Sequence, residues 1–166
     1  MTSKAGFATL LDEHAGLLSR IASSYEADPA LRDDLLQDIA MALWRALPDW
    51  RGEASLKTFV ARIAHNRCVT HVASRVRRPA TAELDENIAE ADAHGPDEHA
   101  HRDQQRLRLQ AAVRGLPLGL RQAVSLALEG FSHQEIADAL GIAANSVGVR
   151  LHRARAALTS ALGDGR

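Results

Sequence analysis

The last part of the chain contains a basic segment whose side chains suit contacts with DNA. Arg150, Arg153 and Arg155 fall within six residues of one another. Guanidinium groups can contact phosphate oxygens and the edge of guanine in the major groove. On a helix, this segment would present one outer face, which we expect to comprise Asn145, Ser146, Gly148, Val149, Arg150, His152, Arg153 and Arg155.

The residues before this segment predict the motif that positions it. Ala137, Gly141 and Val147 have the spacing of a helix-turn-helix, in which a small residue allows two helices to cross closely and glycine allows a positive φ in the turn. The same pattern also fits a pair of packed helices with a solvated basic face. The predicted core side consists of Ile136, Leu140, Ile142, Val147, Leu151, Ala154 and Leu158.

Capping residues set the expected helix boundaries in this half. Ser132 followed by Glu135 is a capping box, which predicts a short helix ending near residue 140. Asn145 is expected to cap a last helix that runs to about Leu162. Two further helices are predicted upstream, over 102–114 and 118–129, because Gly115, Pro117 and Gly130 interrupt the apolar periodicity.

A second basic surface is predicted near the middle of the chain. Ser55 can cap a helix that runs to about Arg77 and is closed by Pro79. Trp50 and Arg51 precede it and could stack on a base and contact phosphate of a single strand. Alternatively, the basic residues form a solvated helix face and Trp50 packs in the core. The candidate DNA-contacting residues are Trp50, Arg51, Lys57, Arg62, His65, Asn66, Arg67 and His71.

An acidic helix edge could bind a basic partner. The pair Asp28-Pro29 predicts a helix start, and the apolar pattern continues to about residue 46. Asp33, Asp34, Gln37 and Asp38 form one polar edge of this helix, beside an apolar stripe that includes Trp44, which we expect to pack in the core. The alternative is an ordinary solvated face whose acids compensate the helix dipole. An earlier helix is predicted over 5–24.

Catalytic chemistry is weakly supported. His65, Cys68 and His71 could share one helix face, but no fourth metal ligand is evident. His94, His99 and His101 lie in an acidic segment where a preorganised site is not expected. The sequence contains no phosphate-binding glycine loop, nucleophile elbow or zincin histidine pair. We therefore expect no enzyme activity, metal or cofactor.

Composition and charge define three parts of the chain. Residues 1–79 carry a net charge of +2, residues 80–101 carry −7 and residues 102–166 carry +4. Abundant Ala and Leu with only 4% aromatic residues favour helices. We predict an all-α protein of two small helical domains joined by a flexible acidic linker, in which Leu84 and Ile88 could dock on a domain. A single cysteine, no membrane-length apolar run and no signal sequence predict a cytoplasmic protein without membrane insertion.

These segments resemble the extracytoplasmic-function (ECF) sigma factors, the compact branch of the sigma-70 family of bacterial RNA polymerase. The stretch from DDLLQDIAMALW through WRGEAS to RVRRP is similar to region 2 of that family. The stretch LPLGLRQAVSLALEGFSHQEIADALGIAANSVGVRLHRARAAL is similar to region 4. Together with the intervening linker, the resemblance covers roughly residues 10–162.

The resemblance implies a role for each surface. Asp34, Gln37, Asp38 and Trp44 would dock on core RNA polymerase. The segment from Trp50 to His71 would open the duplex and hold the −10 strand, and the last helix would read the −35 element. The implied partners are core polymerase, promoter DNA and an anti-sigma factor, with the free protein monomeric or bound to that inhibitor.

Two positions depart from the resemblance, and two other functions remain open. Gly148 stands where many members of the family carry a basic or polar residue. Thr70 stands where an acidic residue is common, and both departures bear on promoter choice. A stand-alone helix-turn-helix regulator would instead bind a palindromic operator without polymerase. A decoy that sequesters an anti-sigma factor would keep the docking surfaces but fail in transcription.

Overall fold

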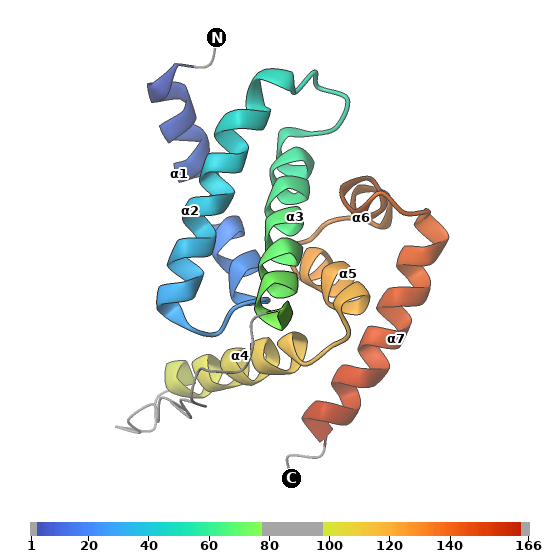
Figure 1. Ribbon diagram of the computed structural model, residues 1–166. Helices are drawn as coiled ribbons and strands as arrows, with labels where there is room; N and C mark the ends of the chain where they lie inside the picture. The colour runs from blue at the N-terminus through green and yellow to red at the C-terminus, as the bar shows by residue number, and fades with distance from the viewer. Residues whose placement is uncertain (1–2, 78–97, 164–166) are drawn as a thin grey trace.

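The computed structural model describes residues 3–77 and 98–163, and every regular element in these ranges is helical, as predicted. The chain order is visible in Figure 1. The elements are α1 (Lys4–Ser23), α2 (Pro29–Ala46), the short 3₁₀ helix η1 (Leu47–Asp49), α3 (Leu56–Arg77), α4 (Glu98–Arg114), α5 (Leu118–Leu128), α6 (His133–Leu140) and α7 (Ala144–Gly163).

Local capping explains several of these boundaries. The Asp28 side chain accepts a hydrogen bond from the Leu31 amide at 3.0 Å, and Ser55 accepts one from Thr58 at 3.1 Å. Both caps were predicted. The expected cap at Asn145 is wrong, because α7 begins at Ala144 and places Asn145 inside its first turn.

The linker boundary also differs from the prediction. We expected the helix after the linker to begin at residue 102, but α4 begins at Glu98. Residues 80–97 of the expected linker, including Leu84, Ile88 and His94, lie outside the described residues.

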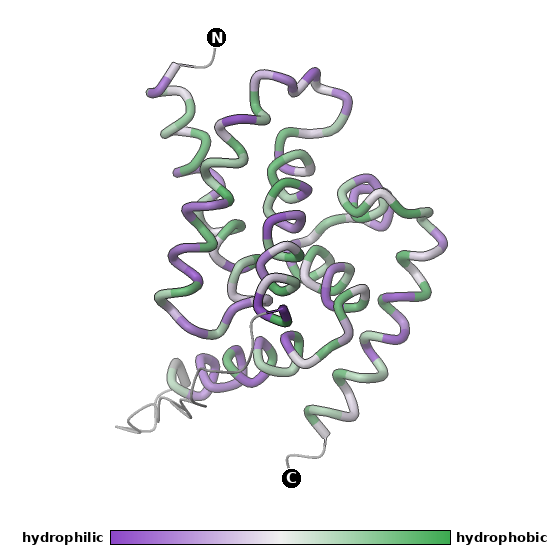
Figure 2. The backbone as a smooth tube through the Cα atoms, in the orientation of Figure 1, coloured by the Kyte–Doolittle hydropathy of each residue, from purple (hydrophilic) through white to green (hydrophobic). Residues whose placement is uncertain are grey.

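The N-terminal block consists of α1, α2 and α3. Helices α1 and α2 pack on each other and both pack on α3. Hydrophobic and hydrophilic residues alternate along these helices, as Figure 2 shows, so each helix has an apolar side to bury. The fully buried side chains at the centre of this block are Ile21, Leu35, Ile39, Leu43 and Val60.

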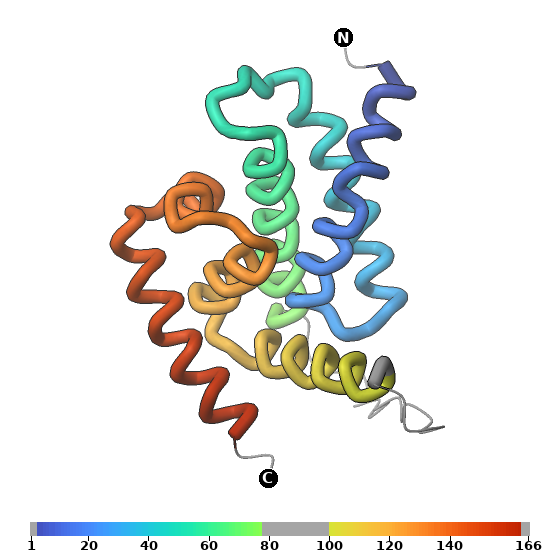
Figure 3. Tube along the Cα trace, turned by 180° about the vertical axis from the view of Figure 1, so that it is seen from behind, coloured from blue at the N-terminus to red at the C-terminus, as the bar shows by residue number. Residues whose placement is uncertain are grey.

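The C-terminal block consists of α4 to α7. Helix α7 packs along α4, α5 and α6, and α5 also contacts α4 and α6. A small apolar cluster at this junction is formed by Val113, Leu116, Val124 and Ala154. Figure 3, seen from behind, shows α4 crossing below the lower ends of α1 and α2.

The two blocks pack directly against each other. Helix α3 contacts both α5 and α6. One apolar cluster runs from Leu10 in α1 to Val147 in α7, and it includes Leu126, Phe131 and Ile136 from the C-terminal block. The acidic segment therefore joins two helical blocks that share a core, an arrangement that the sequence did not indicate.

Candidate polymerase and nucleic-acid interfaces

The predicted acidic edge of α2 faces solvent. Asp34, Gln37 and Asp38 are all exposed. Their helix is anchored from the opposite side by Leu35, Ile39 and Leu43, which are buried. This edge is therefore available to a partner, as a docking surface requires. The sequence alone could not distinguish it from any other solvated helix face.

Trp44 lies at the surface, so the expectation that it packs in the core is wrong. Its side chain is 43% exposed and meets Phe7 of α1 edge to face, with ring centroids 4.9 Å apart. Trp44, Phe7 and Met41 line an apolar hollow of about 410 Å³, flanked by Lys4 and Arg45. A large aromatic beside a charged edge is typical of a protein-binding surface.

The loop before α3 also presents its tryptophan at the surface. Trp50 is 36% exposed, and its indole N–H donates to the Ala54 carbonyl at 3.2 Å. Its ring lies 6.3 Å from that of Phe59, tilted by 44°. Arg51 is exposed next to it, and Gly52 adopts φ 77° in the turn. The indole is thus held by the loop with part of its surface free for stacking.

The outer face of α3 retains four of the six predicted contacts. Lys57, Arg62, Asn66 and Arg67 are exposed. Lys57 and Arg62 nevertheless have partners in the C-terminal block. The Lys57 ammonium donates to the Glu129 carbonyl at 3.2 Å, and Arg62 Nη2 donates to the Asp138 carbonyl at 3.1 Å.

Two predicted DNA contacts, His65 and His71, have partners within the N-terminal block. His65 is 1% exposed, and its Nδ1 lies 2.7 Å from the Tyr25 hydroxyl. Burial lowers the pKa of His65 to about 4, so the ring is neutral near neutral pH. A side chain buried under Tyr25 cannot reach a DNA strand in this arrangement, because the helix turns it into the core.

His71 is half-buried and belongs to an ion-pair cluster around Glu26. Its Nε2 lies 2.7 Å from a Glu26 carboxylate oxygen, which also accepts from Arg75. Burial would raise the pKa of Glu26, but hydrogen bonds from His71, the Asp28 amide and Arg75 outweigh it and lower that pKa. Sequence reasoning missed Glu26, because a single acid between two helices has no distinguishing pattern.

The helix-turn-helix forms as predicted. Ser132 and Glu135 make both hydrogen bonds of a capping box, and Gly141 closes α6 in the left-handed conformation with φ 65°. Ile136, Ala137, Val147 and Ala154 are buried between the helices. These contacts hold α7 in place and leave its other side outward.

Six of the seven predicted −35 residues are exposed on α7. The exception is Arg150, which is half-buried and donates from Nη1 to the Gly119 carbonyl of α5 at 3.4 Å. Arg150 thus helps to hold α7 against α5. The six exposed residues are Asn145, Ser146, Val149, His152, Arg153 and Arg155.

Within residues 3–77 and 98–163, no three His, Cys, Asp or Glu side chains are grouped so as to hold a metal ion. Burial raises the pKa of the Cys68 thiol to about 12, which keeps it protonated and a poor nucleophile. Over the same ranges, no helix is both long and apolar enough to span a bilayer.

Comparison with known families agrees with both blocks. Residues 10–78 match the family model for sigma-70 region 2, and residues 106–158 match that for sigma-70 region 4. The first match covers most of α1 and all of α2 and α3, and the second covers most of α4 to α7.

Curated relatives are similar over most of the chain. RNA polymerase sigma factor NccH of Alcaligenes xylosoxydans xylosoxydans is 30% identical over 165 residues, covering 94% of this chain and 86% of that one. RNA polymerase sigma-H factor of Pseudomonas aeruginosa is 30% identical, covering 78% and 72%. The ECF RNA polymerase sigma-E factor of Escherichia coli K12 is 29% identical, covering 87% and 78%.

Two solved structures share the arrangement. CnrH, in complex with the cytosolic domain of CnrY, superimposes with a TM-score of 0.72 at 25% identity, covering 99% of this chain and 92% of that one. The sigma factor RpoE of Bartonella quintana, in complex with the anti-sigma factor NepR, gives 0.73 at 25% identity, covering 96% and 98%. With both regions matched in order and relatives similar across their length, the chain belongs to the ECF branch of the sigma-70 family and acts in transcription initiation by RNA polymerase.

Proposed function

We propose a division of work among three surfaces of this sigma factor. The edge of α2 formed by Asp34, Gln37 and Asp38, with Trp44 beside it, docks on core RNA polymerase. The loop from residue 50 and the outer face of α3 hold the −10 strand, and the outer face of α7 reads the −35 element. The protein acts in the cytoplasm as a promoter-selecting subunit and catalyses no reaction of its own.

The observation that carries this proposal is the exposed face of α7. Its turn glycine and capping box match a helix-turn-helix, and Arg153 and Arg155 are exposed with His152 beside them. A helix with such a face fits the major groove, where arginine makes bidentate contacts with guanine. Arg150 contributes by fixing the helix on α5.

The −10 surface is smaller than the sequence suggested. Without His65 and His71, it consists of Trp50, Arg51, Lys57, Arg62, Asn66 and Arg67. Trp50 offers a stacking surface, and the cations offer contacts with phosphates, so a single strand is a better fit than a duplex. Capture of unstacked bases would offset the few kcal/mol that each flipped base costs.

Neither DNA surface needs to bind tightly by itself. When both are attached to polymerase, binding of one element places the other surface at high effective concentration near its own element. We also propose an anti-sigma factor as a partner, because the solved neighbour RpoE is a sigma factor in complex with the anti-sigma factor NepR.

Run-off transcription from a genomic fragment library, with core polymerase alone and with this protein added, tests the proposal. Discrete new start sites with shared paired upstream elements are expected. The Arg153→Ala variant should lose starts that depend on the −35 element. Arg108→Ala, an exposed arginine on α4 outside the three surfaces, is the matched control. A stable complex with core that yields no new starts would refute the promoter-selecting role.

A further inference from the structure

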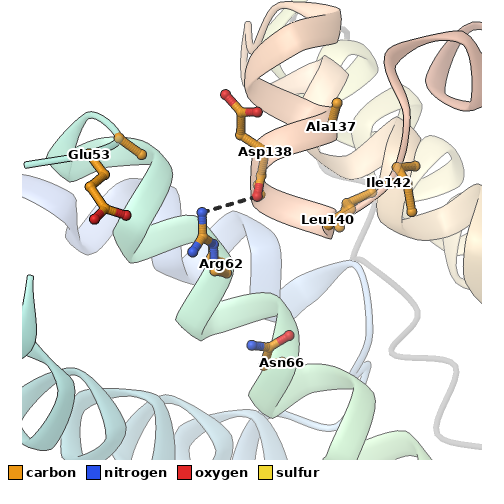
Figure 4. A pocket seen from close by; sticks show the side chains of 10 residues that line it. Glu53, Arg62, Asn66, Ala137, Asp138, Leu140 and Ile142 are labelled. Carbon is orange, nitrogen blue, oxygen red and sulfur yellow. Dashed lines mark hydrogen bonds between the residues drawn. The ribbon is translucent and has the colours of Figure 1, made fainter.

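The structure contains a cavity outside the three surfaces of the proposed function. The cleft in Figure 4 belongs to the −10 surface: it measures about 690 Å³, and Arg62 reaches across it to donate to the Asp138 carbonyl. A second cavity, of about 180 Å³, lies between the end of α1 and helices α4 and α5. None of its lining residues belongs to a surface assigned above, so its chemistry points to a separate role.

Apolar side chains form the walls of this second cavity, which we call the junction cavity. Leu109 and Val113 come from α4, and Leu128 comes from the end of α5. Val113 is 1% exposed whereas Leu128 is 55% exposed, so the cavity extends from the core to the surface. An apolar cavity of about 150 Å³ is large enough to bind benzene. The junction cavity therefore has room for one aromatic ring or an acyl chain of similar size.

Two buried serines line the cavity but have no hydrogen-bond donor left for a ligand. The Ser24 hydroxyl donates to the Arg20 carbonyl at 3.1 Å. The Ser125 hydroxyl donates to the Arg121 carbonyl at 2.7 Å. A hydroxyl carries one hydrogen, and a buried anion needs donors to replace the water that it loses. The charged end of a ligand therefore cannot lie against these serines, and this part of the cavity suits an apolar group.

The charged groups that line the cavity leave one positive charge unneutralised. Arg20 Nε donates to both carboxylate oxygens of Glu129, at 2.9 and 3.0 Å, so these two charges offset each other. Arg106 also lines the cavity, is exposed, and makes no ion pair with any described residue. Gln110 lies one turn further along α4 and adds an amide. A guanidinium group and an amide are donors that suit a carboxylate, and the remaining single charge matches a monoanion better than a phosphate dianion.

We propose that the junction cavity binds a small organic monocarboxylate. The apolar part of the ligand lies against the leucine and valine walls, and its carboxylate binds Arg106 and Gln110. Arg114 Nη1 donates to the Ser23 carbonyl at 2.9 Å beside the cavity, so hydrogen bonds already hold α1 against α4 and the site is preformed. The inference does not depend on the proposed function, because the cavity shares no residue with its three surfaces.

NMR titration of the isotope-labelled full chain tests the site with three probes. The first, 3-phenylpropionate, carries one ring and one carboxylate, and we expect a Kd of about 1 mM for a molecule of its size. The neutral 3-phenylpropan-1-ol keeps the ring and should bind about tenfold more weakly, because it lacks the charge that strengthens hydrogen bonds to Arg106. Propionate lacks the ring and should not bind measurably. No binding of 3-phenylpropionate, or equal affinity for the alcohol, would overturn the proposal.

A matched pair of arginines tests the assigned charge. Arg106→Gln and Arg108→Gln make the same change at two exposed positions of α4, but only Arg106 lines the cavity. Arg106→Gln should weaken binding of 3-phenylpropionate about tenfold and leave binding of the alcohol unchanged. Arg108→Gln should bind both probes as the wild type does. An equal loss in the two variants would show that the overall charge of α4 attracts the probe, and the assigned site would be wrong.

A matched pair of leucines tests the apolar wall. Leu128 and Leu107 are both 55% exposed, but only Leu128 lines the cavity. Because neither is buried, Leu128→Gln and Leu107→Gln should both fold, which thermal unfolding checks. Leu128→Gln should weaken binding of 3-phenylpropionate about fivefold through lost apolar contact, and Leu107→Gln should bind normally. Full affinity in Leu128→Gln, or probe-induced shifts confined to amides outside α1, α4 and α5, would overturn the proposal.

Discussion

The Tyr25 hydroxyl lies 2.7 Å from Nδ1 of His65, and this buried pair joins the end of α1 to the middle of α3. Burial raises the pKa of Tyr25, so its hydroxyl remains protonated and donates to Nδ1. The neutral imidazole then carries its proton on Nε2, which has no hydrogen-bond partner among the described residues. This pair helps to hold α1 against α3. The contact is stable only while the His65 ring is uncharged.

Stability should therefore fall as the pH falls from about 6.5 to about 4. The pKa of His65 is lowered to about 4 in the folded protein, so over this window the unfolded chain binds more protons. The unfolding free energy should fall by about 3 kcal/mol because of His65, at 1.36 kcal/mol for each unit of pKa shift. The lowered pKa of Glu26 adds a loss in the same direction at acid pH.

Urea unfolding at a series of pH values checks this prediction. His65→Gln should flatten the dependence of unfolding free energy on pH between about 6.5 and 4. The matched control is His133→Gln, an exposed histidine at the start of α6. If the pH dependence of the unfolding free energy remained in His65→Gln and disappeared in His133→Gln, its assignment to His65 would be contradicted.

Charge reversal on α2 should prevent binding to core polymerase. Asp34→Lys and Asp38→Lys place cations where the proposed docking surface is acidic, so attraction to a basic partner becomes repulsion. Co-purification with core polymerase should be lost. Asp12→Lys reverses the charge of an exposed residue on α1 and should bind core polymerase normally. Retention of core by the α2 variants would place the docking surface elsewhere.

Two arginines of α7 should respond differently to removal. Arg153 is exposed, so Arg153→Ala should weaken −35-dependent initiation by about 1–3 kcal/mol, the range for a bidentate base contact. Arg150 contacts the Gly119 carbonyl, so Arg150→Ala should lower stability and affect templates with intact and altered −35 elements alike. Run-off from the two templates, with thermal unfolding in parallel, separates these effects. If Arg150→Ala reduced initiation only on the template with the intact −35 element, Arg150 would be shown to read bases.

The same substitution at two glycines should change stability in opposite directions. Gly141 has φ 65°, so Gly141→Ala should destabilise the protein by about 1 kcal/mol or more, although no atom obstructs the added methyl group. Gly148 lies inside α7 with open space around it, so Gly148→Ala should stabilise it by about 1 kcal/mol. Thermal unfolding measures both. A destabilised Gly148→Ala would indicate a constraint on α7 that packing does not explain.

Much of the fold follows from local features of the sequence. Apolar periodicity placed each α-helix of the described ranges to within a few residues, because an amphipathic helix needs one buried side. Ser132, Glu135 and Gly141 fixed the helix-turn-helix through interactions that span only a few residues. Asn145 and Glu98 show the limit, since helix ends can shift by a few residues at little cost.

The surfaces were harder to predict, because exposure depends on residues far away in the sequence. His65 and Asn66 are neighbours on α3, yet Tyr25 covers only the first. Trp44 looked like a core residue until α1 placed Phe7 against one side of it and left the rest exposed. A histidine or tryptophan suits either environment, so its type alone does not decide.

The sequence by itself determined the helices, their caps, the helix-turn-helix and the family to which the chain is similar, since each depends on residue types at short spacing. Only the tertiary structure decided that the two blocks share a core and that Lys57 and Arg62 face the C-terminal block. Those contacts join residues more than seventy positions apart. They depend on the shapes of two assembled surfaces, which no local pattern contains.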